Sequence, residues 1–177
     1  MEPSVEETWR SHLISPIEWQ LSAIALKAAA DLVRDKCQRS ANDTDADYHL
    51  KDVVYGRTYM FLMALAVENA LKAIIVAQRR SELIGCNKLP PWLNTHDLTS
   101  LYRSSNLSQI ARHSSTLEKL KHFIIAGRYP VSNKPLITNT AYMDKPWANA
   151  RMPYIDMLWR HLLEEMRKEK VVNRGIP

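Results

Sequence analysis

The sequence predicts an all-α protein, a bundle of four to five helices. Apolar residues recur at helical spacing in several long segments, and 177 residues are enough for about one domain. Only 4 glycines occur, too few for the turns and phosphate loops of β-sandwich, Rossmann or P-loop folds. No pair of segments shows the pattern of paired strands. We therefore divide the chain into an N-terminal segment (1–14), a helical bundle (15–170) and a tail (171–177).

The first long helix is expected from Pro16 to about Cys37. Ser15 before Pro16 is a typical helix start, because serine can cap the helix and proline suits its first turn. Apolar residues then recur three and four positions apart, and we expect this face to pack in the core: Ile17, Leu21, Ile24, Ala25, Ala28, Leu32 and Val33. A polar, acidic connector over residues 39–47 ends the helix.

The second helix is expected over residues 55–83 and is apolar on almost every side between residues 59 and 77. Such a helix is either buried in a bundle or spans a membrane. Glu68, Asn69 and Lys72 at its midpoint would be costly in lipid, so we expect no membrane span. Glu68 and Lys72 stand four residues apart, which favours either a buried ion pair or an acidic group facing an active cleft.

The remaining elements are shorter. Thr95 is the expected N-cap of a short helix that contains Leu98 and Leu101, and Ser114 or Ser115 is the expected start of the next helix. That helix ends at Gly127 and Arg128. No helical period follows over residues 131–152, which predicts a long irregular loop. The last helix is expected from Pro153.

Charge divides the chain unevenly. Residues 1–56 hold six Lys/Arg against ten Asp/Glu, and residues 57–177 hold eighteen against nine, which gives net charges of −4 and +9. The basic part suits a polyanionic partner such as RNA. The acidic start of the chain lacks a signal sequence, and two cysteines are too few for a disulfide framework, so we expect a cytoplasmic protein. No metal-ligand spacing and no glycine-rich phosphate motif occurs, so we expect neither metal nor cofactor.

Four landmarks carry a resemblance to a known family. The first is the string from Ala66 to Ala73 (AVENALKA), with Glu68 and Lys72 inside the long second helix. The second is Thr95-His96-Asp97-Leu98, and the third is Arg128-Tyr129-Pro130. The fourth is their order, closed by an amphipathic helix. Over residues 15–170 the chain resembles a HEPN domain, a small helical bundle found in nucleotide-binding proteins.

The resemblance implies a fold and an activity. HEPN proteins are compact bundles, often homodimers, and many are metal-independent RNases of toxin–antitoxin and phage-defence systems. Active members carry an arginine that holds phosphate, and a histidine for acid–base chemistry follows after four to six intervening residues. No arginine and histidine of this chain have that spacing. Arg128 stands where the family has its catalytic arginine, but the next histidine is His161.

Candidate site residues follow from these patterns. The expected catalytic group comprises Arg128, Glu68 and two histidines that would approach each other if their helices packed antiparallel, His122 and His161. Basic and aromatic side chains interleave near the irregular loop, as single-stranded RNA binding requires. They are Arg128, Tyr129, Lys134, Tyr142, Lys145, Trp147 and Arg151.

Three functions stay open at this point. The first is a HEPN-like domain without standard RNase activity that binds RNA or a cognate protein partner in a defence or toxin–antitoxin system, as a homodimer. The second is a metal-independent endoribonuclease with a non-standard Arg/His set. The third is a scaffold subunit whose last helix docks a partner through Trp159 and Leu162.

Overall fold

The computed structural model describes residues 4, 8, 11–40, 48–86, 88–128 and 145–169. Its elements are α2 (Pro16–Ser40), α3 (Tyr48–Gln78), α4 (Arg80–Leu83), α5 (Leu98–Ser104), α6 (Ile110–Arg128) and α7 (Lys145–Lys168). No strand occurs among these residues. The all-α bundle expected from the sequence is confirmed.

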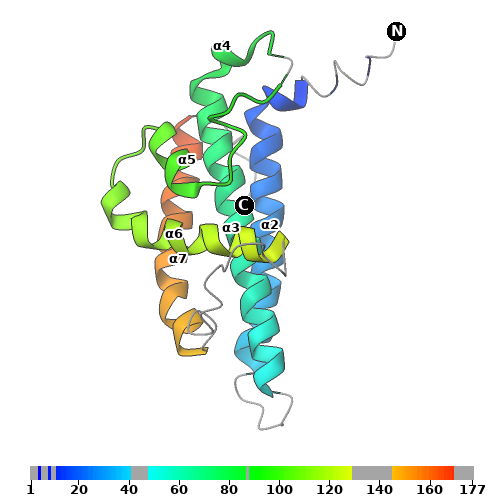
Figure 1. Cartoon of the computed structure of the whole chain (residues 1–177), viewed down its shortest axis with the longest axis vertical. Helices are drawn as coiled ribbons and strands as arrows, with labels where there is room; N and C mark the ends of the chain where they lie inside the picture. The colour runs from blue at the N-terminus through cyan, green and yellow to red at the C-terminus, as the bar shows by residue number, and fades with distance from the viewer. Residues whose placement is uncertain are drawn as a thin grey trace.

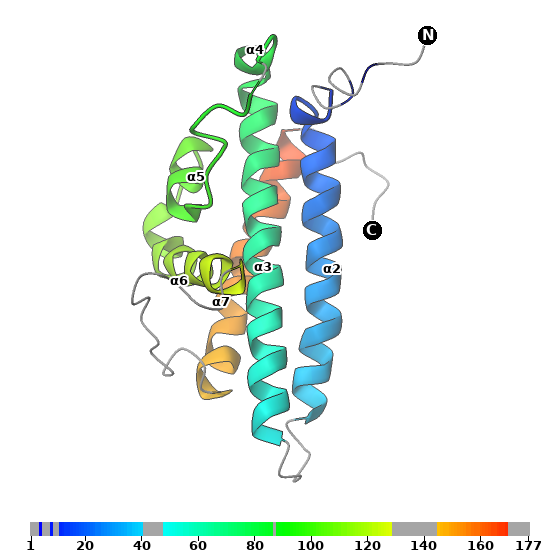
Figure 2. The same ribbon diagram turned by 45° about the vertical axis from the view of Figure 1, so that its right-hand side comes forward.

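Two long antiparallel helices, α2 and α3, form one side of the molecule (Figures 1 and 2). The helix α7 runs along α3 on another side, and α6 crosses α3 at a steep angle (Figure 1). The short helix α5 lies against α3 and α6. The other elements thus pack on α3, and α2 and α7 also meet through charged side chains described below.

The helix α3 is the core of the fold, as its sequence predicts. Most of its side chains between Tyr59 and Val76 are buried. By length and composition the stretch Val54–Gln78 could cross a membrane, and its most apolar window has a mean hydropathy of 1.9. In the structure 72% of its most apolar window is buried within the protein, as in the core helix of a bundle.

The helix α2 packs with a different face from the one we expected. Ile17, Leu21 and Leu32 are exposed, whereas Ala23 and Ala30 are fully buried against the bundle. The small alanines let α2 lie close to the bulky surface of α3, since helix packing depends on ridges that fit into grooves. The expected apolar face of α2 is therefore turned mostly to the outside.

Three expected helix starts are wrong. Asp97, and not Thr95, caps α5, because its carboxylate accepts hydrogen bonds from the backbone N–H groups of Thr99 and Ser100. The helix α6 begins at Ile110, ahead of the two serines. The helix α7 begins at Lys145, with Pro153 inside it, so part of the expected irregular loop is helical. The rest of that loop, residues 129–144, lies outside the described residues, as does the tail at 171–177.

Candidate functional site

A buried carboxylate with two basic partners lies in the C-terminal half of α3. Lys72 Nζ donates a hydrogen bond of 2.7 Å to Glu68 Oε1. His96 Nδ1 lies 3.0 Å from each carboxylate oxygen of Glu68. An ionised carboxylate only accepts hydrogen bonds, so Nδ1 carries the hydrogen in this contact. We call Glu68, Lys72 and His96 the His96 cluster.

The three side chains of the His96 cluster differ in exposure. Glu68 and Lys72 are only 4% and 5% exposed, whereas the His96 side chain is 45% exposed. The ammonium of Lys72 also lies 5.3 Å from the ring centroid of Trp19 on α2, within cation–π range. Each charge of the buried ion pair therefore has one partner besides its counter-ion: His96 for Glu68 and the ring of Trp19 for Lys72. His96 is the most exposed of the three side chains in the cluster.

Local structure fixes the position of His96. The carbonyl of Pro90 accepts hydrogen bonds from the backbone N–H groups of Leu93 and Asn94, which makes a tight turn. Directly after His96, the Asp97 N-cap starts α5. Because a turn and a helix start enclose residues 94–97, the imidazole is held against α3 by backbone on both sides.

The helix α6 is tied to this segment by an ion pair. Lys121 Nζ donates a 2.8 Å hydrogen bond to Asp97 Oδ2. Burial acts to raise the pKa of Asp97, but Lys121 and the backbone donors of Ser100 and Thr99 outweigh it and lower that pKa. The same hydrogen bond raises the pKa of Lys121. Both groups are therefore charged at neutral pH and hold α6 beside His96.

The end of α6 lies on the same side of α3 as the His96 cluster. A Cβ atom at Gly127 would overlap the ring of Phe61, so α6 and α3 approach closely there. Glu68 follows Phe61 by seven residues, or about two helical turns, and so lies on the same face of α3 about 10 Å farther along. Figure 1 shows both α6 and the segment before α5 crossing this side of α3. The end of α6 therefore meets α3 about two helical turns from Glu68.

The two candidate catalytic histidines are not brought together. His161 on α7 stacks on His113 of α6, with ring centroids 5.4 Å apart and an interplanar angle of 17°. Tyr102 of α5 packs near both rings. His122 lies nine residues beyond His113 on α6, which is roughly 13 Å along the helix. His161 therefore meets His113 and not His122, because the buried face of α6 presents His113 to α7.

The stacked pair of His113 and His161 is a buried polar contact that the sequence did not reveal. His113 Nδ1 and His161 Nε2 are buried and have no hydrogen-bond partner in the part of the chain that the structure describes. Burial, and then the nearby His161 and Arg112, lower the pKa of His113. One feature of the sequence indicated that His113 is buried. It lies at helical spacing from Leu117 and Leu120, and so on the same face of α6 as these apolar residues and Thr116.

The residues expected to bind RNA divide into two groups. Arg128 ends α6, while Lys145, Trp147 and Arg151 belong to the first two turns of α7. The other three, Tyr129, Lys134 and Tyr142, lie outside the described residues. The prediction that α7 docks a partner through Trp159 and Leu162 is wrong. Both side chains are buried, because the apolar face of α7 packs into the core.

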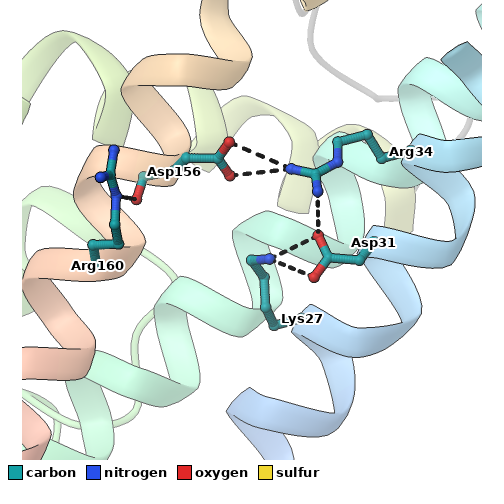
Figure 3. Close-up of polar contacts among 5 residues, drawn as sticks. All are labelled: Lys27, Asp31, Arg34, Asp156 and Arg160. Carbon is teal, nitrogen blue, oxygen red and sulfur yellow. Dashed lines mark hydrogen bonds and ion pairs between the residues drawn. The ribbon is translucent and has the colours of Figure 1, made fainter.

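A second polar network joins α2 to α7 (Figure 3). Arg34 Nη1 lies 3.3 Å from Asp156 Oδ2, and Arg34 Nη2 lies 3.5 Å from Asp31 Oδ1. Lys27 donates to both oxygens of Asp31. Burial, and then the charge of Asp156, raise the pKa of Tyr59 beneath the network. The spacing of Lys27 and Arg34 from Asp31, four and three residues, could have been recognised from the sequence, whereas the contact with Asp156 could not.

Comparison with known proteins gives no further information about the site. Comparison of the chain with family models, curated proteins and solved structures found no match. Within the described residues, no group of three or more His, Cys, Asp or Glu side chains could hold a metal ion.

Proposed function

We propose that this protein is an RNA-binding helical domain of the HEPN type that lacks the Arg/His catalytic pair usual in that family. The observation that carries this proposal is the position of His161. It is the first histidine after Arg128, and its ring is packed against His113 and Tyr102 in the core. A histidine held in that way is not available beside Arg128, which favours binding over the catalysis usual in that family.

Charge supports a polyanionic partner. Over its 19 residues α6 carries four basic side chains against one acidic side chain: Arg112, Lys119, Lys121 and Arg128, with Glu118. The first eleven residues of α7 add Lys145 and Arg151 without an acidic residue. Lysine and arginine neutralise phosphates and release counterions, which gives affinity without base-specific contacts. Trp147 adds an aromatic side chain of the kind that stacks on bases.

A salt titration tests the proposal. We expect the purified full-length chain to bind fluorescently labelled single-stranded RNA, with an affinity that falls as salt rises. The variant Arg128→Ala/Lys145→Ala/Arg151→Ala should bind more weakly, and the slope of log K against log salt should fall by about 0.7 for each phosphate that the variant no longer neutralises. The matched control, Arg80→Ala/Arg167→Ala, changes exposed arginines on α4 and at the end of α7 and should leave binding unchanged. Absence of salt-dependent binding by the wild type would refute RNA as the partner.

A second candidate function is a metal-independent endoribonuclease with a non-standard Arg/His set. The half-exposed His96 favours it, because a carboxylate that binds Nδ1 orients the imidazole for acid–base chemistry. In this set His96 would take the place we first gave to His122 or His161, beside Arg128. RNA should then be cleaved with chelator present, and cleavage should disappear in both His96→Ala and Arg128→Ala. An intact RNA pool after incubation with wild-type protein would rule this candidate out.

A further inference from the structure

The outer face of α2 carries an unbroken row of apolar side chains. Ile17, Leu21 and Leu32 are 44%, 46% and 70% exposed, and the exposed Ala25 and Ala28 stand between them. These five positions follow each other at spacings of three and four residues, so they lie on one side of the helix. We call them the α2 stripe. From Ile17 to Leu32 the stripe is about 22 Å long.

No residue in the described part of the chain covers the α2 stripe. The helix forms one edge of the molecule, with α3 beside it (Figure 2). The polar side of α2 is already used, because Arg34 and Asp31 join the network with α7 (Figure 3). Exposed apolar side chains in a continuous row mark an interaction surface more often than isolated ones do.

We propose that the α2 stripe is the contact surface between two copies of this chain, with the two α2 helices packed antiparallel. In one register, Leu21 of each copy lies opposite Leu32 of the other copy. The same register places Ala25 opposite Ala28 of the other copy. The stripe thus has large side chains toward its ends and small ones at its centre, which lets two identical helices approach closely. A two-fold axis passes between the two layers in which Ala25 faces Ala28, so every contact occurs twice in the dimer.

Charge favours the same register. Lys36 follows Glu18 by five complete turns of about 3.6 residues, so both lie along the same edge of the α2 stripe. Both side chains are exposed, and they stand at opposite ends of the stripe. In an antiparallel pair, Glu18 of each copy lies opposite Lys36 of the other copy, which gives two attractive contacts. A parallel pair would instead keep Glu18 of each copy and Lys36 of the other copy at opposite ends of the α2 stripe, where they do not meet.

This agreement argues for a second copy over a different partner. The apolar layers define one antiparallel register, and the pairing of Glu18 with Lys36 defines another. These two registers differ by only one residue. An isologous contact needs that kind of self-complementarity, whereas an unrelated partner would not require it. One helix pair of this length is at the small end of stable interfaces, so we expect a dissociation constant of about micromolar size. The proposal does not depend on RNA binding.

Sedimentation velocity of the full-length chain over a wide concentration range tests the proposal. The wild type should shift from monomer to dimer as its concentration rises. Leu21→Glu/Leu32→Glu should be monomeric throughout, with unchanged helicity by circular dichroism. The matched control, Ile84→Glu, alters an equally exposed apolar residue just after α4 and should dimerise like the wild type.

A charge exchange tests the register. Glu18→Lys should raise the dissociation constant several-fold, because two attractive contacts become repulsive. Glu18→Lys/Lys36→Glu should return it close to the wild-type value, since the exchanged charges again face each other. A wild type that stays monomeric at every concentration overturns the proposal. So does a dimer that survives Leu21→Glu/Leu32→Glu, because its interface must lie elsewhere. A dimer insensitive to the charge exchange contradicts the antiparallel register.

Discussion

Removing one partner of the buried pair Glu68–Lys72 should destabilise the protein strongly. The substitution Lys72→Met keeps the length and most of the volume of the side chain but removes its charge. The carboxylate of Glu68, only 4% exposed, then keeps His96 as its partner from another part of the chain. The substitution Glu68→Leu does the reverse and leaves a buried ammonium beside the ring of Trp19.

The size of the effect follows from the geometry. Two unit charges 2.7 Å apart attract each other by about 6 kcal/mol at an effective dielectric constant of about 20. Much of this attraction only offsets the cost of taking both ions out of water. Removal of one ion leaves the desolvation cost of the other, so we expect each single substitution to lower the free energy of unfolding by about 3 to 5 kcal/mol.

The double variant distinguishes this reasoning from a simple loss of packing. Glu68→Leu/Lys72→Met removes both buried charges and keeps an apolar volume. Such replacements are often neutral or stabilising, so the double variant should unfold within about 1.5 kcal/mol of the wild type. Urea denaturation followed by circular dichroism, at neutral pH, measures all four proteins. A single substitution that costs less than about 1 kcal/mol, or a double variant that loses the sum of both singles, would refute the reasoning.

Three further predictions concern stability. Gly127→Ala should lower the free energy of unfolding by about 1 to 3 kcal/mol, because the new Cβ atom overlaps the ring of Phe61. Gly56→Ala, whose Cβ atom meets nothing within 4 Å, should instead raise it by about 0.5 to 1 kcal/mol. Equal effects of the two substitutions on the melting temperature would contradict this. Asp97→Ala should cost about 1 to 2 kcal/mol through loss of the α5 cap, and Asp97→Asn should retain most of that stability in urea denaturation. Because burial lowers the pKa of His113 below its ordinary 6.5, the unfolded chain binds a proton more readily, so stability should be complete above that pH and fall as the pH drops through the lowered pKa. A His113→Phe variant with the same loss of stability between about pH 7 and pH 5 would show that another group is responsible.

Part of the candidate site could be predicted from the sequence because it depends on one helix only. Glu68 and Lys72 lie four residues apart on a helix that is apolar nearly all round, so burial and pairing follow together. The 2.7 Å contact confirms that pairing. The third member, His96, could not be predicted, because its contact with Glu68 spans 28 residues and depends on how the turn at Pro90 places the following segment.

The errors concern choices between neighbouring surfaces. The row from Ile17 to Leu32 is as apolar as a core face, yet α2 packs on α3 with Ala23 and Ala30. Helical periodicity identifies an apolar row but does not say whether the core or another molecule covers it. In the same way, α6 offers two histidines to α7, and only the packing of α6 across α3 decides that His113 meets His161.

The sequence by itself determined the all-helical class, the central place of α3 and the ion pair inside it. Each of these depends on spacing within one helix, where backbone geometry alone fixes which side chains are neighbours. Tertiary structure decided which face of α2 is buried, which histidine contacts His161 and how His96 reaches Glu68. These contacts join residues from different elements, and their energies depend on how well several surfaces fit at once.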